Sequence, residues 1–224
     1  MTSPTAARWV FGATAAVVLV GLVIQTQAVV SADEAFFDGT AARVFNMFCF
    51  FTVQSNVIVG ITCALLAWRI DLGDHSTAFR VFRLVGVIDI AITGLVYNVA
   101  LADLTELDGK AAVADQLVHV VVPIVAVAGW LLFGPRGWIA GRDIALAALV
   151  PLAWLVFTLI RGPIVDWYPY PFLDVRDHGY PRVFANCVAV GLLFLALAAG
   201  ARALDRALDR RVDRRVSGPV SGTL

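Results

Sequence analysis

Charged side chains are scarce in this chain of 224 residues. They account for 15% of it, whereas hydrophobic residues account for 60% and the mean hydropathy is +0.82. A soluble domain has about 25% charged and about 45–50% apolar residues, so the composition excludes an ordinary soluble protein and indicates an integral membrane protein. One crossing takes about 20 apolar residues, and about six crossings would leave room only for short loops.

Cysteine and histidine are also rare. The three cysteines, Cys49, Cys63 and Cys187, lie in apolar stretches without zinc-type spacing, so we interpret them as small hydrophobic residues. Of three histidines only His119 falls in an apolar run, which leaves a bis-histidine haem without its second ligand. A glycine-rich phosphate loop is missing too. We therefore expect neither a metal site nor a cofactor.

Neither sign of charge is in excess, because 17 basic residues balance 17 acidic ones. This balance removes any overall electrostatic case for binding nucleic acid. Lysine occurs once, as Lys110, and the other basic residues are arginine. Together with abundant Ala, Val and Leu, this usage suggests a GC-rich bacterial genome, and hence a multi-pass protein of the inner (plasma) membrane.

Long apolar runs, bounded by charged or turn residues, predict six membrane-spanning helices. We expect an all-α, polytopic six-helix transmembrane bundle in residues 1–201 and a basic cytoplasmic tail in residues 202–224. The six spans fall at about 9–30, 44–68, 82–102, 113–133, 143–160 and 183–201.

The first apolar run has an alternative interpretation as a signal peptide. Arg8 precedes it, and the sequence at 30–32 resembles a cleavage site. However, the run is longer than the core of a signal peptide, and Gln25 and Gln27 interrupt the approach to that site. A transmembrane helix is the preferred interpretation.

Basic residues are distributed unevenly between the two sides of the predicted bundle. Twelve fall at the amino end, in the 2–3 and 4–5 loops and in the tail, and five fall on the other side among ten acidic residues. Both termini should therefore be cytoplasmic. The tail has a net charge of +3 and places Leu204, Leu208, Val212 and Val216 on one helical face. It either binds anionic lipid or is a solvated helix end that only fixes the topology.

Polar residues inside the spans are informative, since hydrocarbon makes them costly unless they are paired or used. On the second span Cys49, Thr52, Ser55 and Asn56 lie within about 120° of one another around the helix, which forms a polar stripe. Small polar residues also hydrogen-bond between helices. That structural role is the preferred interpretation of Ser55.

His119 is an ionisable group in the fourth span and is therefore a candidate site residue. The alternative is a neutral imidazole that bridges two helices. Pro123 leaves the His119 carbonyl without its helical partner, which predicts a kink and space beside the ring. Asp115 lies one turn toward the outer surface on the same face and is placed to accept a hydrogen bond from the imidazole.

Thr52 and His119 lie at similar depths, about 13 Å and about 9–13 Å below the outer ends of their helices. A hydroxyl beside an imidazole beside a carboxylate has the arrangement of nucleophile, base and orienting group in covalent hydrolysis. Whether the two helices are adjacent is left open by the sequence.

Asp89 lies deeper, about 21 Å from the outer end of the third span. Such a carboxylate suits a proton-coupled transporter, but neither a second buried acid or base nor an inverted repeat accompanies it. A structural partnership with a hydroxyl or with Arg83 is preferred. Tyr97 and Asn98, on the same helix, lie closer to the depth of Thr52.

The stretch from Arg161 to Asp174 concentrates proline and aromatic residues and cannot be helical throughout. Trp167, Tyr168 and Tyr170 are candidates to roof a lipid-facing cavity, with Arg161 available to a carboxylate or phosphate headgroup. Alternatively, the stretch is an interfacial anchor without a ligand.

Three short motifs carry a family resemblance. These are Phe-Phe-Thr-Val-Gln-Ser-Asn at 50–56, His-Val-Val-Val-Pro at 119–123 and Tyr-Pro-Tyr-Pro-Phe-Leu-Asp at 168–174. With six spans, the chain resembles a family of bacterial six-helix integral membrane proteins and, distantly, the androgen-induced membrane threonine hydrolases, which cleave fatty acid esters of hydroxy fatty acids. The resemblance covers roughly residues 44–200, and implies that the family threonine and histidine fall on Thr52 and His119.

The sequence thus predicts an intramembrane hydrolase of a lipid ester with Thr52 as nucleophile and His119 as base. Asp115 would orient the histidine, and Asn56 or Asn98 would donate to the oxyanion. The membrane lipid or lipid-like substrate would enter an outer-half cavity. A non-catalytic lipid-binding or sensing protein is the alternative, and a small transporter is the third choice.

Overall fold

The computed structural model describes residues 3–32, 36–69, 76–104 and 106–216, with side chains up to residue 211 except that of residue 103. The chain is an all-α transmembrane bundle with six helices long and apolar enough to cross a membrane. The α-helices are α1 (Pro4–Ser31), α2 (Thr40–Phe48), α3 (Phe51–Trp68), α4 (Thr77–Val96), α5 (Gly109–Gln116), α6 (Val122–Phe133), α7 (Gly141–Val165) and α8 (Val175–Val216).

Two of the six spans contain a π-helical turn. The third span continues α4 into the turn η1 (Tyr97–Leu101), and the fourth joins α5 to α6 through the turn η3 (Leu117–Val121). Single 3-10 turns follow at η2 (Ala102–Leu104) and at η4 (Pro171–Leu173). Such π-helical turns are rare and frequently lie at functional sites, so these two stretches direct attention to the residues they carry.

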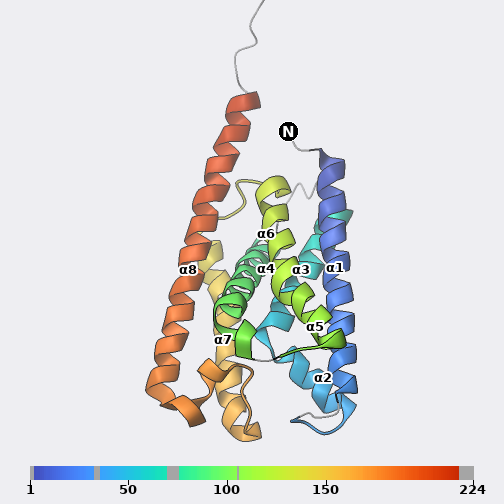
Figure 1. Cartoon of the computed structure of the whole chain (residues 1–224). Coiled ribbons are helices and arrows are strands. Elements are labelled where there is room, and N and C mark those ends of the chain that lie inside the picture. Colours follow the sequence, from blue (N-terminus) through green and yellow to red (C-terminus); the bar gives the residue numbers. More distant parts are fainter. Residues whose placement is uncertain (1–2, 33–35, 70–75, 105, 217–224) are drawn as a thin grey trace, which may run out of the picture.

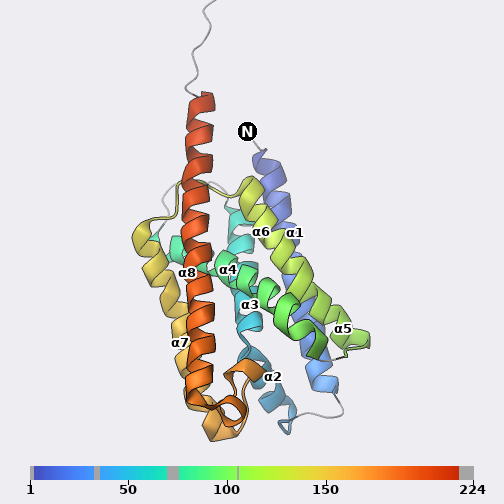
Figure 2. The same cartoon turned by 60° about the vertical axis from the view of Figure 1, so that its left-hand side comes forward.

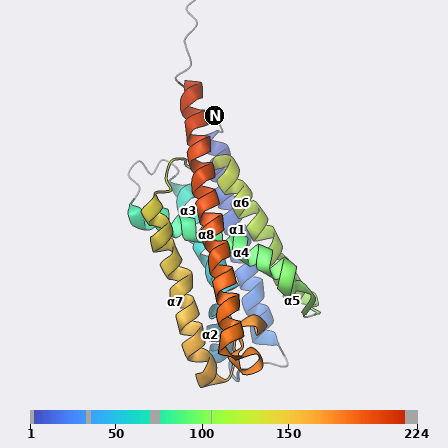
Figure 3. The same cartoon turned by 90° about the vertical axis from the view of Figure 1, so that its left-hand side faces the viewer.

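Helix α4 is the centre of the bundle and packs against α3, α6, α7 and α8. On one flank α1 packs against α3, α5 and α6, and on the other α7 lies beside α8, as Figures 1, 2 and 3 show from three sides. The amino end of α1 and the carboxyl end of α8 lie at the same end of the bundle (Figure 1). Helix α2 and the loop 166–174, called the roof loop below, lie at the opposite end.

Two apolar clusters hold the bundle together, and α4 contributes to both. One joins it to α7 and α8 through residues such as Val85, Ala147 and Ala198. The other joins it to α1, α3 and α6 and includes the fully buried Ile90 and Val122. Large apolar side chains also cover the outside of α7 and α8. Contact with lipid tails is as favourable for them as burial in a protein interior, because the tails are equally apolar.

The predicted second span is not continuous. Helix α2 ends at Phe48, Phe50 has an extended backbone (ψ 133°), and α3 begins at Phe51. Thr52 therefore lies in the first turn of a helix rather than nine residues into one. Cys49 is the C-cap of α2, so the expected four-residue polar stripe was wrong in including it.

No proline or glycine marks this break; side chains from other positions stabilise it instead. The Gln54 amide donates to the carbonyl of Phe48 (3.0 Å), and the Trp154 indole of α7 donates to the carbonyl of Cys49 (2.9 Å). In hydrocarbon a helix can end only where such groups satisfy its backbone. A contact with another helix thus stabilises a break that no helix-ending residue in the local sequence explains.

The last two predicted spans were too short. Helix α7 passes through Pro163 to Val165, and α8 begins at Val175, bends at Gly179 (φ 69°) and runs on to Val216. The first part of the predicted tail therefore continues the last transmembrane helix. Leu204 of its apolar face is exposed, and the side chains of Val212 and Val216 lie outside the described part.

Helices α4 and α6 approach closely where Gly94 lies against Pro123. A Cβ atom built on Gly94 would lie 2.7 Å from the Pro123 Cβ and 3.1 Å from its Cγ. Real Cβ contacts are essentially never below 3.0 Å, and the proline ring is stiff. Gly94 therefore permits the distance at which the two π-helical turns meet.

We expect Gly94→Ala to destabilise the protein by a net amount of about 1–2 kcal/mol. Overpacking costs about 1–3 kcal/mol, which outweighs the gain of up to about 1 kcal/mol that alanine brings to a helix. Thermal unfolding in detergent measures it. Gly200→Ala in α8 is the control, because its added Cβ would meet nothing within 4 Å. A stability of Gly94→Ala equal to or above that of the control would contradict the packing argument.

Candidate functional site

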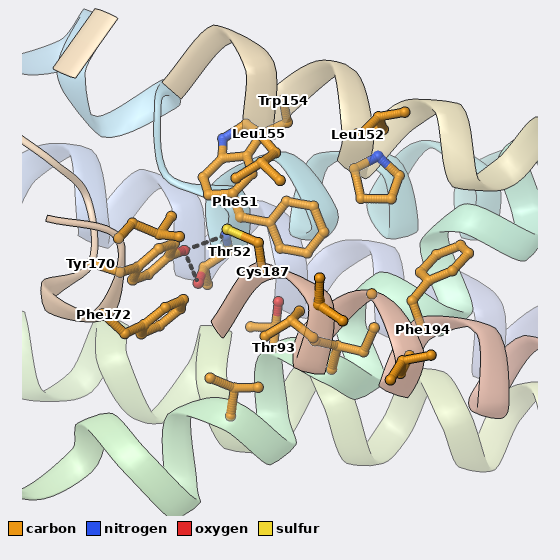
Figure 4. Close-up of a pocket in the computed structure, with 18 of the residues that line it drawn as sticks. Phe51, Thr52, Thr93, Leu152, Trp154, Leu155, Tyr170, Phe172, Cys187 and Phe194 are labelled. Carbon is orange, nitrogen blue, oxygen red and sulfur yellow. Dashed lines mark hydrogen bonds between the residues drawn. The ribbon is translucent and has the colours of Figure 1, made fainter. Parts of the chain in front are cut away.

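A cavity of about 420 Å³ lies between α3, α4, α7 and α8 (Figure 4). The roof loop contributes Tyr170, Phe172 and Leu173 to it, the last two from the turn η4. Hydroxyl groups reach it from Thr52, Thr93, Tyr97 and Tyr170, whereas none of the described residues that line it is charged. The volume is within the range of small-molecule sites, about 300–1,000 Å³, and the lining suits an apolar chain with an uncharged polar group.

The cavity opens sideways between α7 and α8. Leu152, Val188, Leu192 and Leu195 line it and are also 43–61% exposed, so they form its rim. All four belong to segments long and apolar enough to span the membrane. The mouth therefore faces the hydrocarbon of the bilayer, where acyl chains are the molecules available to enter.

Thr52 lies at the end of this cavity and is 7% exposed. Its backbone N–H donates to Tyr170 Oη (3.1 Å), and its Oγ1 lies 3.2 Å from the same oxygen, either hydroxyl being able to donate. Figure 4 shows both contacts. The first N–H groups of any helix lack partners within the helix, so Tyr170 does for α3 what a capping side chain would do.

Aromatic side chains hold Tyr170 at this position. Its ring stacks on Phe172 (5.4 Å between centroids, 5° between planes), meets Phe50 edge to face and lies tilted against Trp154. Burial raises the pKa of the Tyr170 phenol, although hydrogen bonds from Thr52 oppose the effect. The phenol therefore remains neutral and keeps its O–H.

Ion pairs fasten the roof loop itself. Arg176 Nη2 lies 2.5 Å from Asp174 Oδ2, and its Nη1 lies 2.5 Å from Asp166 Oδ1. Hydrogen bonds from Arg176 hold the pKa of the Asp174 carboxyl below its usual range. Tyr168 packs so closely on Gly162 that a methyl group at residue 162 would overlap its ring.

His119 belongs to a second polar cluster, formed where the two π-helical turns meet. Its Nδ1 lies 2.8 Å from Asp115 Oδ1, which confirms the predicted hydrogen bond. Tyr97 donates to the other oxygen of the same carboxylate (2.6 Å) and stacks on the imidazole, 3.8 Å away and 11° from parallel. Asp115 thus fixes both rings, and Nε2 is left for any proton transfer.

Thr52 and His119 belong to neighbouring turns of the fold, but their side chains bond to other partners. The Asn56 amide donates to the carbonyls of Thr52 (2.9 Å) and of Val118 (3.2 Å), which ties the turn that carries His119 to the first turn of α3. Among the described residues, however, Thr52 Oγ1 is bonded to Tyr170, and the cavity is lined by Tyr97 but not by His119. The imidazole is therefore one ring removed from the cavity.

The two predicted oxyanion donors have other partners. Asn56 uses its amide nitrogen on two carbonyls and is fully buried. Asn98 donates to the carbonyls of Gly94 (2.7 Å) and of His119 (3.3 Å). The second of these bonds serves the carbonyl that Pro123 leaves without a helical donor. Neither asparagine lines the cavity. The prediction that they donate to the oxyanion was therefore wrong, and both satisfy backbone carbonyls instead.

Three of the four predicted substrate contacts also lie outside the cavity. Arg161 belongs to α7 rather than to a loop; its guanidinium donates to Asn46 Oδ1 (3.0 Å) and lies over the rings of Phe37, Phe45 and Trp167. Trp167 packs on Phe37 and Phe50, and Tyr168 packs beneath Arg176. Of the four, only Tyr170 lines the cavity.

The sequence analysis missed several lining residues, such as Trp154, Cys187 and Phe194. They are apolar or only weakly polar residues in apolar helices, and no local feature separates them from side chains that face lipid.

Asp89 is 1% exposed and lies one turn from Thr93, away from the roof loop. Its Oδ1 has no partner among the described residues, and Arg83 donates to the carbonyl of Pro135 instead.

Comparison of the whole chain with protein-family models, curated proteins and solved structures found no match. In the described part of the chain, no three His, Cys, Asp or Glu side chains are grouped so that they could hold a metal ion. The six apolar helices and the cavity between them define the protein as a multi-pass membrane protein with a laterally open, apolar cavity.

Proposed function

We propose that the protein is an intramembrane hydrolase of lipid esters, in which Thr52 is the nucleophile. The observation that carries the proposal is the position of Thr52, a buried hydroxyl at the end of an apolar cavity that opens to the bilayer. An acyl chain in this cavity would bring its ester group to Thr52. The resemblance to the membrane threonine hydrolases supports the same assignment.

His119 is the proposed general base. Because its ring does not touch Thr52, it acts through one bridging water. By this route it accepts the proton of Thr52 Oγ1 as this oxygen bonds to the acyl carbon, and it returns that proton to the alkoxide as the ester C–O bond breaks and the alcohol leaves. Water then attacks the acyl-Thr52 ester, His119 again transfers the proton, and a fatty acid is released. The hydrogen bond to Asp115 supports this role because it leaves Nε2 free for the transfer.

We expect Thr52→Ala and His119→Ala each to lower turnover of a long-chain ester about a thousandfold or more. The double variant should be little worse than either single one, because the members of a catalytic unit are not additive. Thr52→Ser should keep part of the activity. The assay is release of fatty acid by purified protein in detergent.

Ser55→Ala is the matched control for this assay. Ser55 lies on the same helix, is 1% exposed and bonds to Thr93 (3.1 Å), but it does not line the cavity. We expect it to retain turnover. Equal rates for wild type and Thr52→Ala would exclude Thr52 as the nucleophile.

A second candidate function is lipid binding without hydrolysis. The observation that favours it is that Thr52 bonds to Tyr170 rather than to His119. In that case the cavity stores or senses a lipid, and the cluster of Tyr97, Asp115 and His119 is a structural support.

Cys187 provides a test of cavity occupancy. It lines the cavity, whereas Cys49 and Cys63 are only 5% and 7% exposed and lie outside it. We expect a long-chain ester to slow maleimide labelling of Cys187, and Cys187→Ser to abolish labelling. Rates that do not depend on added lipid would contradict entry of an acyl chain.

We further propose that both termini are cytoplasmic and that the membrane is the inner membrane of a bacterium. The arginine distribution supports this orientation, and the last helix would then carry its basic end to the anionic lipid of the inner leaflet. A reporter fused after residue 224 should be active only as a cytoplasmic fusion. A periplasmic signal would overturn the topology.

A further inference from the structure

Tyr170 Oη occupies a specific place relative to Thr52. It lies 3.1 Å from the backbone nitrogen of Thr52 and 3.2 Å from Oγ1, inside the cavity and at the first turn of α3. In acyl transfer by serine-type hydrolases, the backbone N–H of the nucleophile is one of the donors to the acyl oxygen. Such donors lie about 2.7–3.1 Å from that oxygen in the transition state.

We propose that the Tyr170 hydroxyl oxygen stands where the carbonyl oxygen of the bound ester must go, so that Tyr170 is a gate over Thr52. This inference rests on the proposed function, because it takes the ester carbonyl to lie at Thr52. When the ester enters, its carbonyl oxygen replaces Tyr170 Oη on the Thr52 N–H. Tyr170 is thus a positioning residue that keeps the site closed in the absence of substrate.

The surroundings of Tyr170 suit a gate. Its ring belongs to the roof loop rather than to a helix, and its contacts with Phe50, Trp154 and Phe172 are between rings, which can slide without breaking a hydrogen bond. The loop is held at its first and last residues by Arg176, through Asp166 and Asp174. The tyrosine can therefore turn away while the loop remains attached to α8.

The gate also accounts for the burial of Thr52. Without Tyr170 Oη, the N–H of Thr52 would be an unpaired donor facing hydrocarbon, which is costly. The phenol satisfies it until a ligand with a carbonyl oxygen arrives. A ligand without such an oxygen cannot compensate for the loss, so the gate selects for chains that carry a carbonyl group.

The test compares a long-chain methyl ketone with the alkane of equal length, because neither can be hydrolysed. Their affinities are measured from protection of Cys187 against maleimide, in wild type, Tyr170→Phe and Tyr168→Phe. Tyr168→Phe is the matched control: its hydroxyl lies in the same loop, is buried without a partner among the described residues, and does not reach the cavity.

Tyr170→Phe should bind the ketone about three- to tenfold more tightly than wild type, since the ligand no longer displaces a hydrogen bond. Its affinity for the alkane and both affinities of Tyr168→Phe should be unchanged. An unchanged or weaker ketone affinity in Tyr170→Phe would overturn the gate, and weaker binding would make the phenol a donor to the ligand. If Tyr170→Phe does not fold, Tyr170→Leu is compared in the same way.

A second readout separates the gate from the hydrolase. A fluorophosphonate probe should label Thr52 several-fold faster in Tyr170→Phe than in wild type, and should not label Thr52→Ala. Tighter ketone binding without any Thr52 labelling would refute the hydrolase and support the gate. Thr52 labelling with an unchanged ketone affinity would support the hydrolase and refute the gate.

Discussion

The hydrogen bonds between Thr52 and Tyr170 join the first turn of α3 to the roof loop, and the arrangement of the cavity depends on them. In hydrocarbon an exposed backbone N–H is expensive, so a helix can begin inside the membrane only where another group accepts from it. The Tyr170 hydroxyl does this for α3 and so permits the break after Cys49. Because of that break, Thr52 lies in the first turn of a helix and lines the cavity.

The same requirement organises the second polar cluster. Pro123 deprives the carbonyl of His119 of a donor, and Asn98 supplies one across the interface between the two π-helical turns. Gly94 permits the approach that makes this bond possible. Asp115 then holds Tyr97 and His119 with its two oxygens. These bonds hold the two rings and the two π-helical turns in one arrangement.

These two clusters support the proposed chemistry to different degrees. Thr52 faces the cavity and would meet an acyl group there, which suits both hydrolysis and binding. His119 is oriented by a carboxylate, as a base would be, but its ring lies behind Tyr97 as seen from the cavity. The position of Thr52 in the cavity wall therefore supports hydrolysis. The position of His119 outside the cavity favours the second candidate, lipid binding without hydrolysis.

The sequence alone determined the all-α class, the number of spans and the Asp115–His119 hydrogen bond, because hydropathy and the spacing of i and i+4 residues on a helix are local properties. Only the tertiary structure decided that the second span breaks, that Tyr170 meets Thr52 across 118 residues of chain, and that Arg161 lies among aromatic rings. Each of these depends on which helices are neighbours. Apolar helices in lipid carry little sequence information about their neighbours, since a leucine facing lipid and a leucine facing a cavity satisfy the same local rule.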